Sequence, residues 1–538
     1  MNYLLVLVGA MAVSVSMVPI LARLAPRLGL MDAPGQRKVH QRPVPRVGGI
    51  AVVCGALLSV GAFSDVDPLL ASYLIGSGVL FGFGLWDDAA EIGHYWKFLG
   101  QFLAVMPVVG AGLYVTSLPF VGGPVTPVVG LTVTVVAMVG MINAVNHSDG
   151  LDGLAGGEVL LTLAGIALIA YLYDGRTTLA IVSGTLGGVL GFLRYNNHPA
   201  RVFMGDSGSQ FLGFTVAFLL VAITQRTATD LTPSVVLLLA GLPVADILVV
   251  FYKRISGGMN WFRATRNHLH HRLLDLGFSQ VETVTVIYSI QVALVSTGIA
   301  LAHAPDWLLV GIYLVTVAVT FGAVAMAERV GWQRVRGNRK VGATDDPGWS
   351  RWMVVAPRRF IGAAIPLYLA GTSLLVTDVS PWTGRAAAAM SAMLMLVFLF
   401  VRRAHSLIHR AVLYITVGVI SYEAGMQLTL QGWSAVAESI LFVLLLVSVV
   451  VAVMFSPGRR KVEFRPTSTD YLAVLILLAG LAISGGALLE TQETRLIVEA
   501  LILFYGVELI MTEKRERWHM LSTATLGSAM ILALRTAF

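Results

Sequence analysis

Long apolar runs alternate with short polar segments along almost the whole chain. A run of about 20 apolar residues is long enough to cross a bilayer as a helix. The pattern predicts eleven spans in the first part of the chain, at about 3–22, 48–63, 68–86, 97–115, 127–145, 155–173, 177–194, 208–224, 234–252, 281–303 and 306–327. It predicts seven more at about 360–376, 385–401, 411–428, 435–455, 470–488, 495–511 and 520–536. We therefore expect an all-α, polytopic integral membrane protein.

A basic segment rich in Gly, Asp and Pro interrupts this pattern at residues 328–359. It separates residues 1–327, which contain nearly all the polar motifs, from residues 360–538, which contain few. We interpret 1–327 as a functional transmembrane core, 328–359 as a cytoplasmic linker and 360–538 as a C-terminal transmembrane region of unknown role.

Composition supports a membrane protein and excludes several other classes. Hydrophobic residues make up 56% of the 538 residues, charged residues make up 12%, and the mean hydropathy is +0.79. Ordinary soluble domains contain about 25% charged residues. The net charge of +7 therefore does not indicate nucleic-acid binding, and the single cysteine, Cys54, excludes a disulfide scaffold.

The distribution of basic residues predicts which loops lie in the cytoplasm. Basic residues concentrate in cytoplasmic loops of membrane proteins. With the N-terminus outside and the spans alternating, all but five of the 37 Lys and Arg residues fall on the inner side; the exceptions are Arg176, Arg226, Arg385, Arg495 and Arg535. We expect the N-terminus outside and the polar motifs described next on the cytoplasmic face.

Two adjacent carboxylates, Asp87 and Asp88, stand at the inner end of the third predicted span, and Lys97 begins the next span. Adjacent carboxylates repel each other, so they need a metal ion, a cation or a shared proton. An ordinary acidic helix end is the alternative interpretation of this pair.

Oxygen-bearing side chains recur every third residue at Asn143, Asn146, Asp149 and Asp152. This spacing places them along one side of a helix, and carboxylate and amide oxygens suit a hard cation such as Mg²⁺. A calcium EF-hand is excluded because its bidentate acid is missing at the required position. A polar turn remains the alternative.

Asp206 lies among small residues at the start of the eighth predicted span, in Phe203-Met-Gly-Asp-Ser-Gly-Ser. A helix start of this kind leaves backbone N–H groups free to receive phosphate, and Asp206 could hold a metal ion beside it. The chain contains no Gly-Lys dipeptide and hence no Walker A loop.

A polar inner loop contains His268, His270, His271 and Arg272. Arg binds phosphate through two parallel hydrogen bonds, so we favour phosphate or nucleotide binding here, with a zinc site or an incidental His-rich loop as alternatives. Asp246 and Glu508 are further acids within predicted spans, and the sequence assigns neither a role.

These motifs predict one site at the cytoplasmic membrane edge that performs phosphoryl transfer. Metal ions neutralise phosphate oxygens, cations hold them, and a carboxylate activates the nucleophile. The position at the membrane edge indicates a lipid as one substrate. A transporter of an anionic or lipid-linked substrate is the alternative from another class, although it predicts acids near the bilayer midplane.

The ordered motifs resemble those of the polyprenyl-phosphate N-acetylhexosamine-1-phosphate transferases of glycosyltransferase family 4. The resemblance covers residues 1–327 and rests on five motifs, at 32–49, 87–88, 143–154, 203–209 and 268–272. The basic residues Lys38 and His40 and the 268–272 loop are most similar to the branch that initiates O-antigen, teichoic acid and related envelope polysaccharides.

The resemblance implies a reaction, cofactor and partners. N-acetylhexosamine 1-phosphate, most often GlcNAc-1-phosphate, would pass from a UDP-sugar to polyprenyl phosphate, giving the polyprenyl-diphospho-sugar and UMP. UDP-GalNAc or a diamino sugar is the alternative donor. Mg²⁺ or Mn²⁺ is the implied cofactor, the bacterial inner membrane the implied location, and a homodimer is left open.

The resemblance also implies residue roles. It assigns metal binding to Asn146 and Asp206, and catalytic roles to Asp87, Asp88, Asp149 and Asp152, of which one of the first two would deprotonate the lipid phosphate or form an aspartyl-phosphate. It assigns substrate binding to Lys38, His40, Lys97, Asn143, His268, His270, His271 and Arg272. The family core does not require residues 360–538, which we expect to be accessory.

Overall fold

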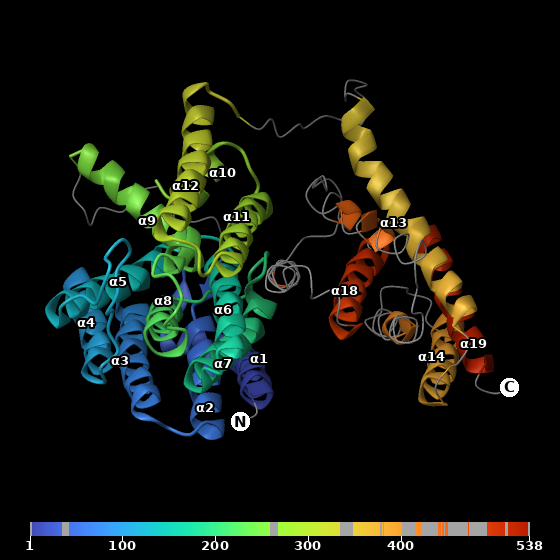
Figure 1. Cartoon of the computed structure of the whole chain (residues 1–538), viewed down its shortest axis with the longest axis horizontal. Coiled ribbons are helices and arrows are strands. Elements are labelled where there is room, and N and C mark those ends of the chain that lie inside the picture. The colour runs from blue at the N-terminus through green and yellow to red at the C-terminus, as the bar shows by residue number, and fades with distance from the viewer. Residues whose placement is uncertain are drawn as a thin grey trace. The chain divides into compact units, whose positions relative to one another are not determined.

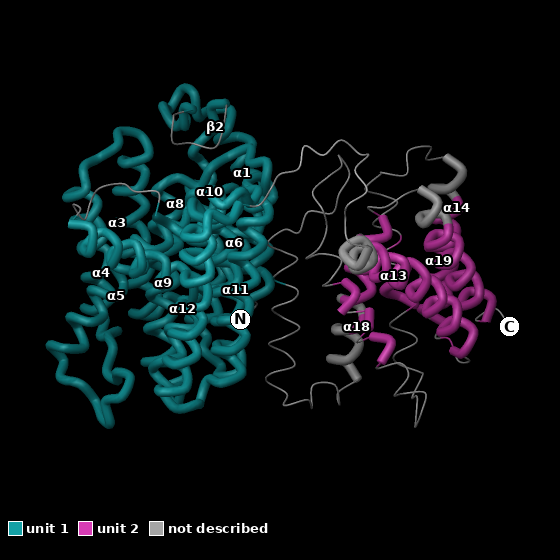
Figure 2. Tube along the Cα trace, turned by 90° about the horizontal axis from the view of Figure 1, so that it is seen from above, with its two compact units in different colours: residues 1–336, 467–483 teal, residues 337–466, 484–538 magenta. Residues whose placement is uncertain are grey.

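The computed structural model describes residues 3–34, 42–258, 267–333 and 348–376, and beyond these 379, 381–400, 413, 416–420, most of 440–449, 472, 492–511 and 515–535. The chain forms two compact units (Figure 2). Unit 1 comprises residues 1–336 and 467–483, and unit 2 comprises residues 337–466 and 484–538. The predicted linker at 328–359 includes the point where the chain first leaves unit 1.

Unit 1 is a bundle of long helices (Figure 1). Its long helices are α1 (Tyr3–Leu28), α2 (Gly48–Phe63), α3 (Pro68–Ala90), α4 (His94–Gly110), α5 (Pro127–Ser148), α6 (Leu154–Leu172), α7 (Arg176–Asn196), α8 (Asp206–Ala222), α9 (Val235–Ser256), α11 (Gln280–Ala300) and α12 (Asp306–Arg329). These helices coincide with the eleven spans predicted up to residue 327.

Shorter elements complete unit 1. The π-helix η1 (Ile223–Thr227) continues α8, and the short helix α10 (Leu269–Asp275) precedes α11. Strands β1 (Met31–Asp32) and β2 (Val44–Pro45) pair antiparallel, with Met31 opposite Pro45. In the described part of the chain, nine helices are long and apolar enough to cross a membrane, whereas α2 and α4 have 16 and 17 residues. The predicted all-α membrane fold is confirmed.

Helix α8 forms the centre of unit 1. Every residue from Ser207 to Ala222 is buried, and α2, α3, α5 and α6 all pack against this helix. The Tyr73 hydroxyl of α3 meets Thr215 Oγ1 of α8 at 3.0 Å. By contrast, α1 buries only one residue per turn, because it packs against α2 and α7 along a single face.

The start of α8 is locked by close backbone contacts. A Cβ built on Gly49 of α2 would lie 2.3 Å from the backbone nitrogen of Gly208. A Cβ built on Gly84 of α3 would lie 2.5 Å from the Cα of Ser207. Real Cβ atoms do not approach other heavy atoms so closely, so glycine at these positions lets α2 and α3 touch the α8 backbone.

Helix α9 is broken within its buried part. Gly241 adopts φ 61° and ψ −136°, and Pro243 follows two residues later. Proline removes a backbone donor and disrupts the helical hydrogen-bond ladder. Side chains from other helices satisfy the freed groups: Gln291 Oε1 accepts the Leu242 N–H at 3.0 Å, and the Tyr313 hydroxyl donates to the Gly241 carbonyl at 3.1 Å.

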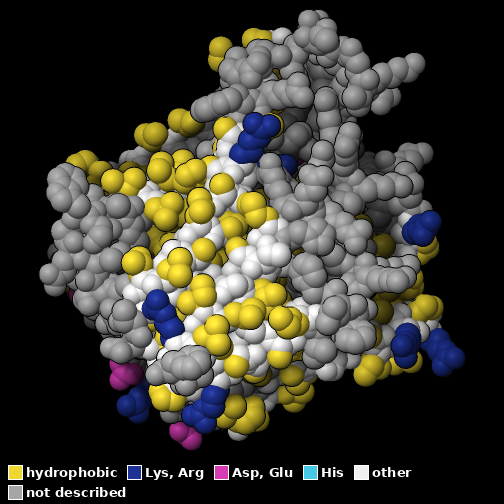
Figure 3. All heavy atoms as spheres, turned by 90° about the vertical axis from the view of Figure 1, so that its right-hand side faces the viewer, with side chains coloured by type: hydrophobic (Ala, Val, Ile, Leu, Met, Phe, Trp, Pro, Cys, Tyr) yellow, Lys and Arg dark blue, Asp and Glu magenta, His cyan; other side chains and the backbone are white. Residues whose placement is uncertain are grey.

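Unit 2 contains α13 (Gly348–Leu375), α14 (Pro381–Phe400), α18 (Gln492–Met511) and α19 (Arg515–Arg535), which cover four of the seven predicted C-terminal spans. The other three, at 411–428, 435–455 and 470–488, lie largely outside the described residues. On the face shown in Figure 3, hydrophobic side chains cover much of the described surface and acidic side chains lie at its lower margin. Lys and Arg side chains also lie on this face, so its described surface is largely but not wholly apolar.

Candidate active site

A cleft of about 800 Å³ opens where α3, α5 and α7 end and α4 and α8 begin. The sequence places these segments far apart, and the fold brings them together at one end of unit 1. The cleft is lined by seven of the predicted site residues: Asp87, Asp88, Lys97, Asp149, Asp152, Asp206 and His271.

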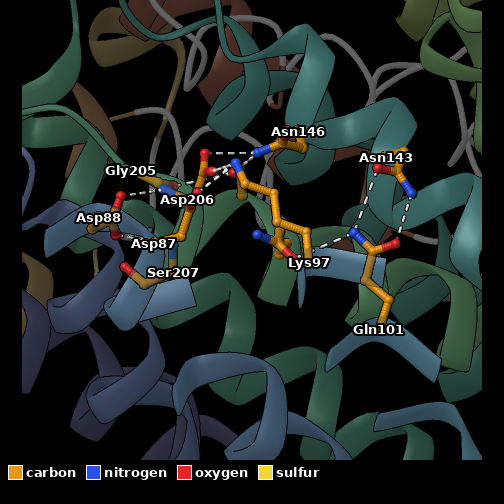
Figure 4. A network of polar contacts seen from close by, with 11 residues as sticks. Asp87, Asp88, Lys97, Gln101, Asn143, Asn146, Gly205, Asp206 and Ser207 are labelled. Carbon is orange, nitrogen blue, oxygen red and sulfur yellow. Dashed lines mark hydrogen bonds and ion pairs between the residues drawn. The ribbon is translucent and has the colours of Figure 1, made fainter. Parts of the chain in front are cut away.

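Lys97 joins two carboxylates from different helices at the inner end of this cleft (Figure 4). Its Nζ lies 2.5 Å from Asp87 Oδ2 and 2.6 Å from Asp206 Oδ2. The other oxygen of Asp87, Oδ1, is buried and has no hydrogen-bond partner among the described residues. A cation between two carboxylates offsets their mutual repulsion, so the arrangement is suited to holding positive charge.

Asp88 has a different environment from Asp87, although the two are adjacent. Its Oδ1 accepts the Asp206 N–H at 2.7 Å, and its Oδ2 accepts the Ser207 N–H at 3.0 Å. These are the first residues of α8, whose N–H groups have no partner within the helix. Gly205 has φ 75°, and a Cβ there would lie 2.7 Å from Asp88 Oδ1. Asp88 therefore caps α8 and fixes the backbone that carries Asp206.

The two asparagines at the end of α5 take part in separate networks (Figure 4). The Asn146 amide donates to Asp206 Oδ1 at 2.9 Å and to Ser209 Oγ at 2.8 Å, next to the cleft. Asn143 instead donates to Gln101 Oε1 at 2.8 Å and is not among the residues that line the cleft. The structure therefore places Asn143 behind Asn146, with Gln101 as its partner.

Asp149 and Asp152 occupy the turn between α5 and α6. Loss of contact with water, together with the negative charges of Asp206, Asp88 and Asp152, raises the pKa of Asp149 to about 7. Burial also acts to raise the pKa of Asp152, but hydrogen bonds from His198 at 2.7 Å and from the Ala200 N–H at 3.0 Å outweigh it and lower that pKa. Asp152 thus remains ionised and anchors the loop at 197–203.

The His-rich loop lies beside the cleft, but its members point in different directions. His271 lines the cleft, whereas His268, His270 and Arg272 are buried and are not among its lining residues. Arg272 forms two hydrogen bonds of 2.8 Å with Glu328 at the end of α12. Its guanidinium is therefore bound to a carboxylate of this chain, and substrate binding by Arg272 stays a prediction.

Several cleft residues were not predicted from the sequence. Asp32 and Arg46 form an ion pair across the β1–β2 strands, and both line the cleft. His198 and Gln280 also line it. Asp32 belongs to a motif noted above and could have been proposed, whereas His198 and Gln280 lie outside those motifs. The predicted residues Lys38 and His40 lie outside the described residues.

The donor atoms at this site fit a divalent cation that is completed by substrate. The described residues contain no cluster of three or more His, Cys, Asp or Glu side chains arranged to hold a metal ion. Mg²⁺ commonly uses one or two carboxylates plus substrate phosphates and water, without a complete protein cage. Asp206 and the adjacent Asn146 supply hard oxygen donors of this kind.

Comparison with known proteins agrees with this geometry. Residues 70–224 match the family described as "Glycosyl transferase family 4". The undecaprenyl-phosphate alpha-N-acetylglucosaminyl 1-phosphate transferase of Salmonella typhi is 32% identical over 304 residues, which cover 54% of this chain and 83% of the relative. The chain belongs to glycosyl transferase family 4, the polyprenyl-phosphate N-acetylhexosamine-1-phosphate transferases. The predicted family is thus confirmed.

Other members of glycosyl transferase family 4 show the same relationship. The probable undecaprenyl-phosphate N-acetylglucosaminyl 1-phosphate transferase of Bacillus subtilis (strain 168) is 31% identical over 312 residues, covering 56% of this chain and 85% of the relative. The undecaprenyl-phosphate alpha-N-acetylglucosaminyl 1-phosphate transferase of Yersinia pestis is 29% identical over 320 residues, which cover 57% of this chain and 87% of the relative. The segment that matches the family, residues 70–224, includes Asp87, Lys97, Asn146 and Asp206.

Proposed function

We propose that the protein transfers N-acetylglucosamine 1-phosphate from UDP-GlcNAc to a polyprenyl phosphate and thereby initiates a cell-envelope polysaccharide. An oxygen of the lipid phosphate attacks the β-phosphorus of the donor. The bond from that phosphorus to the oxygen bridging to the α-phosphate breaks, so that UMP leaves and the polyprenyl-diphospho-sugar forms. Both the family membership and the sequence of acidic motifs support this reaction.

One observation carries the proposal: Lys97, Asp87 and Asp206 converge at the inner end of a polar cleft. Transfer between two phosphates gathers negative charge, and positioned cations stabilise this charge in the transition state. The carboxylates would hold the metal ion and accept a proton, while Lys97 would move from them to the diphosphate. A transport pathway would instead be expected to place its acids near the middle of the helices.

The two adjacent carboxylates receive different tasks. Asp87 retains an unpartnered buried oxygen, so it would accept the proton of the lipid phosphate, whereas both oxygens of Asp88 are bound to the α8 backbone. Asp206 and Asn146, with Asp87 beside them, would hold Mg²⁺ or Mn²⁺. The bound metal would neutralise phosphate oxygens. Asp149 and Asp152 line the same wall and would order the loops around the uridine.

The cleft is proposed to face the cytoplasm, where nucleotide-activated sugars are made, with the N-terminus outside the bacterial inner membrane. The excess of Lys and Arg on the same side supports this orientation. Cysteine-accessibility labelling provides a test, in which a cysteine introduced at exposed Tyr95, near the cleft, should react only after the membrane is permeabilised.

A transfer assay on the purified protein tests the reaction. It combines undecaprenyl phosphate, Mg²⁺ and a panel of UDP-sugars, and follows UMP release and lipid-linked product together. UDP-GlcNAc should give both products in equal amounts and stop doing so when EDTA is added. Turnover of UDP-GalNAc or a diamino sugar alone would change the assigned donor, and no UMP from any donor in a well-folded sample would refute the proposal.

A further inference from the structure

Asp246 is a buried acid that the proposed chemistry does not use. It lies in the second half of α9, three residues after Pro243, and is 6% exposed. Its Oδ2 lies 2.7 Å from His268 Nδ1, and its Oδ1 accepts the Leu269 N–H at 2.8 Å. Both carboxylate oxygens are therefore directed at the residues that begin α10.

The contact supplies α10 with an N-terminal cap from another helix. The first N–H groups of a helix lack partners within it, and a Ser, Thr, Asp or Asn side chain at the N-cap position usually satisfies one of them. Here the N-cap residue is His268, whose side chain makes no capping hydrogen bond. Asp246 takes over this role and holds His268 at the same time.

The position of α10 determines which imidazole reaches the cleft. The His268 ring stacks on His147 at 5.3 Å, and the ring of His270 packs so closely on Gly150 that a Cβ there would lie 2.3 Å from its Nε2. His271, on the same short helix, lines the cleft. Arg272 of α10 forms an ion pair with Glu328, so α10 is held in place by bonds to both Asp246 and Glu328.

We propose that Asp246 is a positioning residue for the donor: through His268 and the Leu269 N–H it fixes α10 so that His271 faces the cleft. This rests on the proposed function, because UDP-GlcNAc is the ligand that His271 would meet. A buried carboxylate deprived of its partner is costly, so the two bonds to Asp246 specify one placement of α10. His268 then anchors α10 to Asp246, and His271 is the residue of the loop that faces the substrate.

Three variants separate a positioning role from general stability. Asp246→Asn keeps an acceptor for the Leu269 N–H but removes the negative charge, and its amide N–H can meet His268 Nδ1 only if the imidazole moves its proton to Nε2. His268→Gln removes the donor at the Nδ1 position, whereas His268→Asn retains a donor there and lacks only the far side of the ring. Tyr313→Phe is the matched control, because Tyr313 bonds the broken part of α9 from a buried site away from the His loop.

The kinetic readout is the KM for each substrate in the transfer assay, with thermal midpoints measured alongside. Asp246→Asn should raise the KM for UDP-GlcNAc about ten-fold or more, the loss expected for a hydrogen bond to a charged group, with the KM for undecaprenyl phosphate unchanged. His268→Asn should raise the KM for UDP-GlcNAc less than His268→Gln does. The double variant Asp246→Asn/His268→Gln should have a KM no higher than that of the more impaired single variant, because the two residues act through one contact. Tyr313→Phe should leave both KM values unchanged.

Other results would overturn the assignment. Equal defects in His268→Asn and His268→Gln would mean that the imidazole itself contacts substrate, and additive losses in the double variant would mean that Asp246 acts independently. Hydrogen–deuterium exchange gives a readout that needs no turnover: Asp246→Asn should raise exchange in a peptide covering residues 267–276, and Tyr313→Phe should not. If the wild type is inactive but the variants show this exchange pattern, the proposed reaction is refuted. If Asp246→Asn leaves exchange at residues 267–276 unchanged, the proposed positioning of α10 by Asp246 is refuted.

Discussion

Replacing Asp87 or Asp88, the two neighbouring carboxylates at the end of α3, by asparagine should have different consequences for the protein. Asp88→Asn should destabilise the protein, because Asp88 holds the first two N–H groups of α8. Asp87→Asn should instead keep the fold and lose turnover, because Asp87 lines the cleft and bonds Lys97 and no backbone N–H of α8. The sequence alone gives no reason to treat the two differently.

The hydrogen bonds of Asp88 set the size of the effect. The asparagine oxygen can still accept one N–H, but its NH₂ group would face the other, so one of the bonds of 2.7 and 3.0 Å is lost. A hydrogen bond to a charged group contributes roughly 1.5–3 kcal/mol, and a negative charge at a helix N-terminus contributes about 0.3–1 kcal/mol more. Asp88→Asn should therefore cost about 2–4 kcal/mol.

The assay compares thermal unfolding in detergent with the rate of UMP release. Asp67→Asn is the matched control, since Asp67 caps the opposite end of α3 by accepting the Leu70 N–H at 2.6 Å and the Thr177 hydroxyl at 2.6 Å. It should lower the thermal midpoint by several degrees yet retain turnover. Asp88→Asn should lower both the thermal midpoint and the rate of UMP release. Asp87→Asn should lower the rate about 100-fold or more, as expected for loss of a general base, with little change in the thermal midpoint.

An Asp88→Asn variant as stable as the wild type would refute the capping role, whatever its activity. An Asp87→Asn variant that unfolds several degrees earlier while retaining turnover would refute the catalytic role assigned to Asp87.

Three further predictions concern the metal, the pH and the C-terminal region. Asp206→Asn should abolish transfer and weaken the dependence on Mg²⁺ while the protein still folds; full activity, measured as UMP release, would contradict its role as a ligand. Because the pKa of Asp149 is raised to about 7 in the folded state, its protonation favours folding at low pH, and this contribution is lost as the pH rises through about 7. Asp149→Asn should therefore gain thermal stability relative to the wild type as the pH rises from about 4 to about 7, with no further gain above about pH 8, and a constant difference over this range would contradict the raised pKa. A chain ending near residue 340 should retain turnover if residues 360–538 are accessory, and loss of turnover in a folded sample would show that they contribute to the site.

The helices of unit 1 were predictable because lipid imposes a simple rule on the sequence. Each span needs an apolar run of nearly fixed length, so α1 to α9, α11 and α12 follow from the pattern alone. Several acidic residues of the cleft were also predictable, since Asp87, Asp149 and Asp206 stand out in a chain with so few charges, whereas Asp32 was missed.

Contacts between distant segments were not predictable in the same way. Periodicity shows which face a residue occupies, but it does not show which helix lies opposite. The pairs Asp246 with His268 and Arg272 with Glu328 depend on where α10 docks against α9 and α12. The capping of α8 by Asp88 likewise requires the glycine contacts between α2, α3 and α8, so two carboxylates that look equivalent in the sequence differ in the fold.

Those glycine contacts also limit how this enzyme can diverge. Gly49 and Gly84 leave no space for even a methyl group against the α8 backbone, so single substitutions cannot shift the start of α8 in small steps. Libraries for directed evolution should therefore yield inactive variants at these positions whatever the donor offered. New sugar specificity would have to arise in the segments that border the cleft without sharing this junction, namely residues 198–200 and the short helix α10.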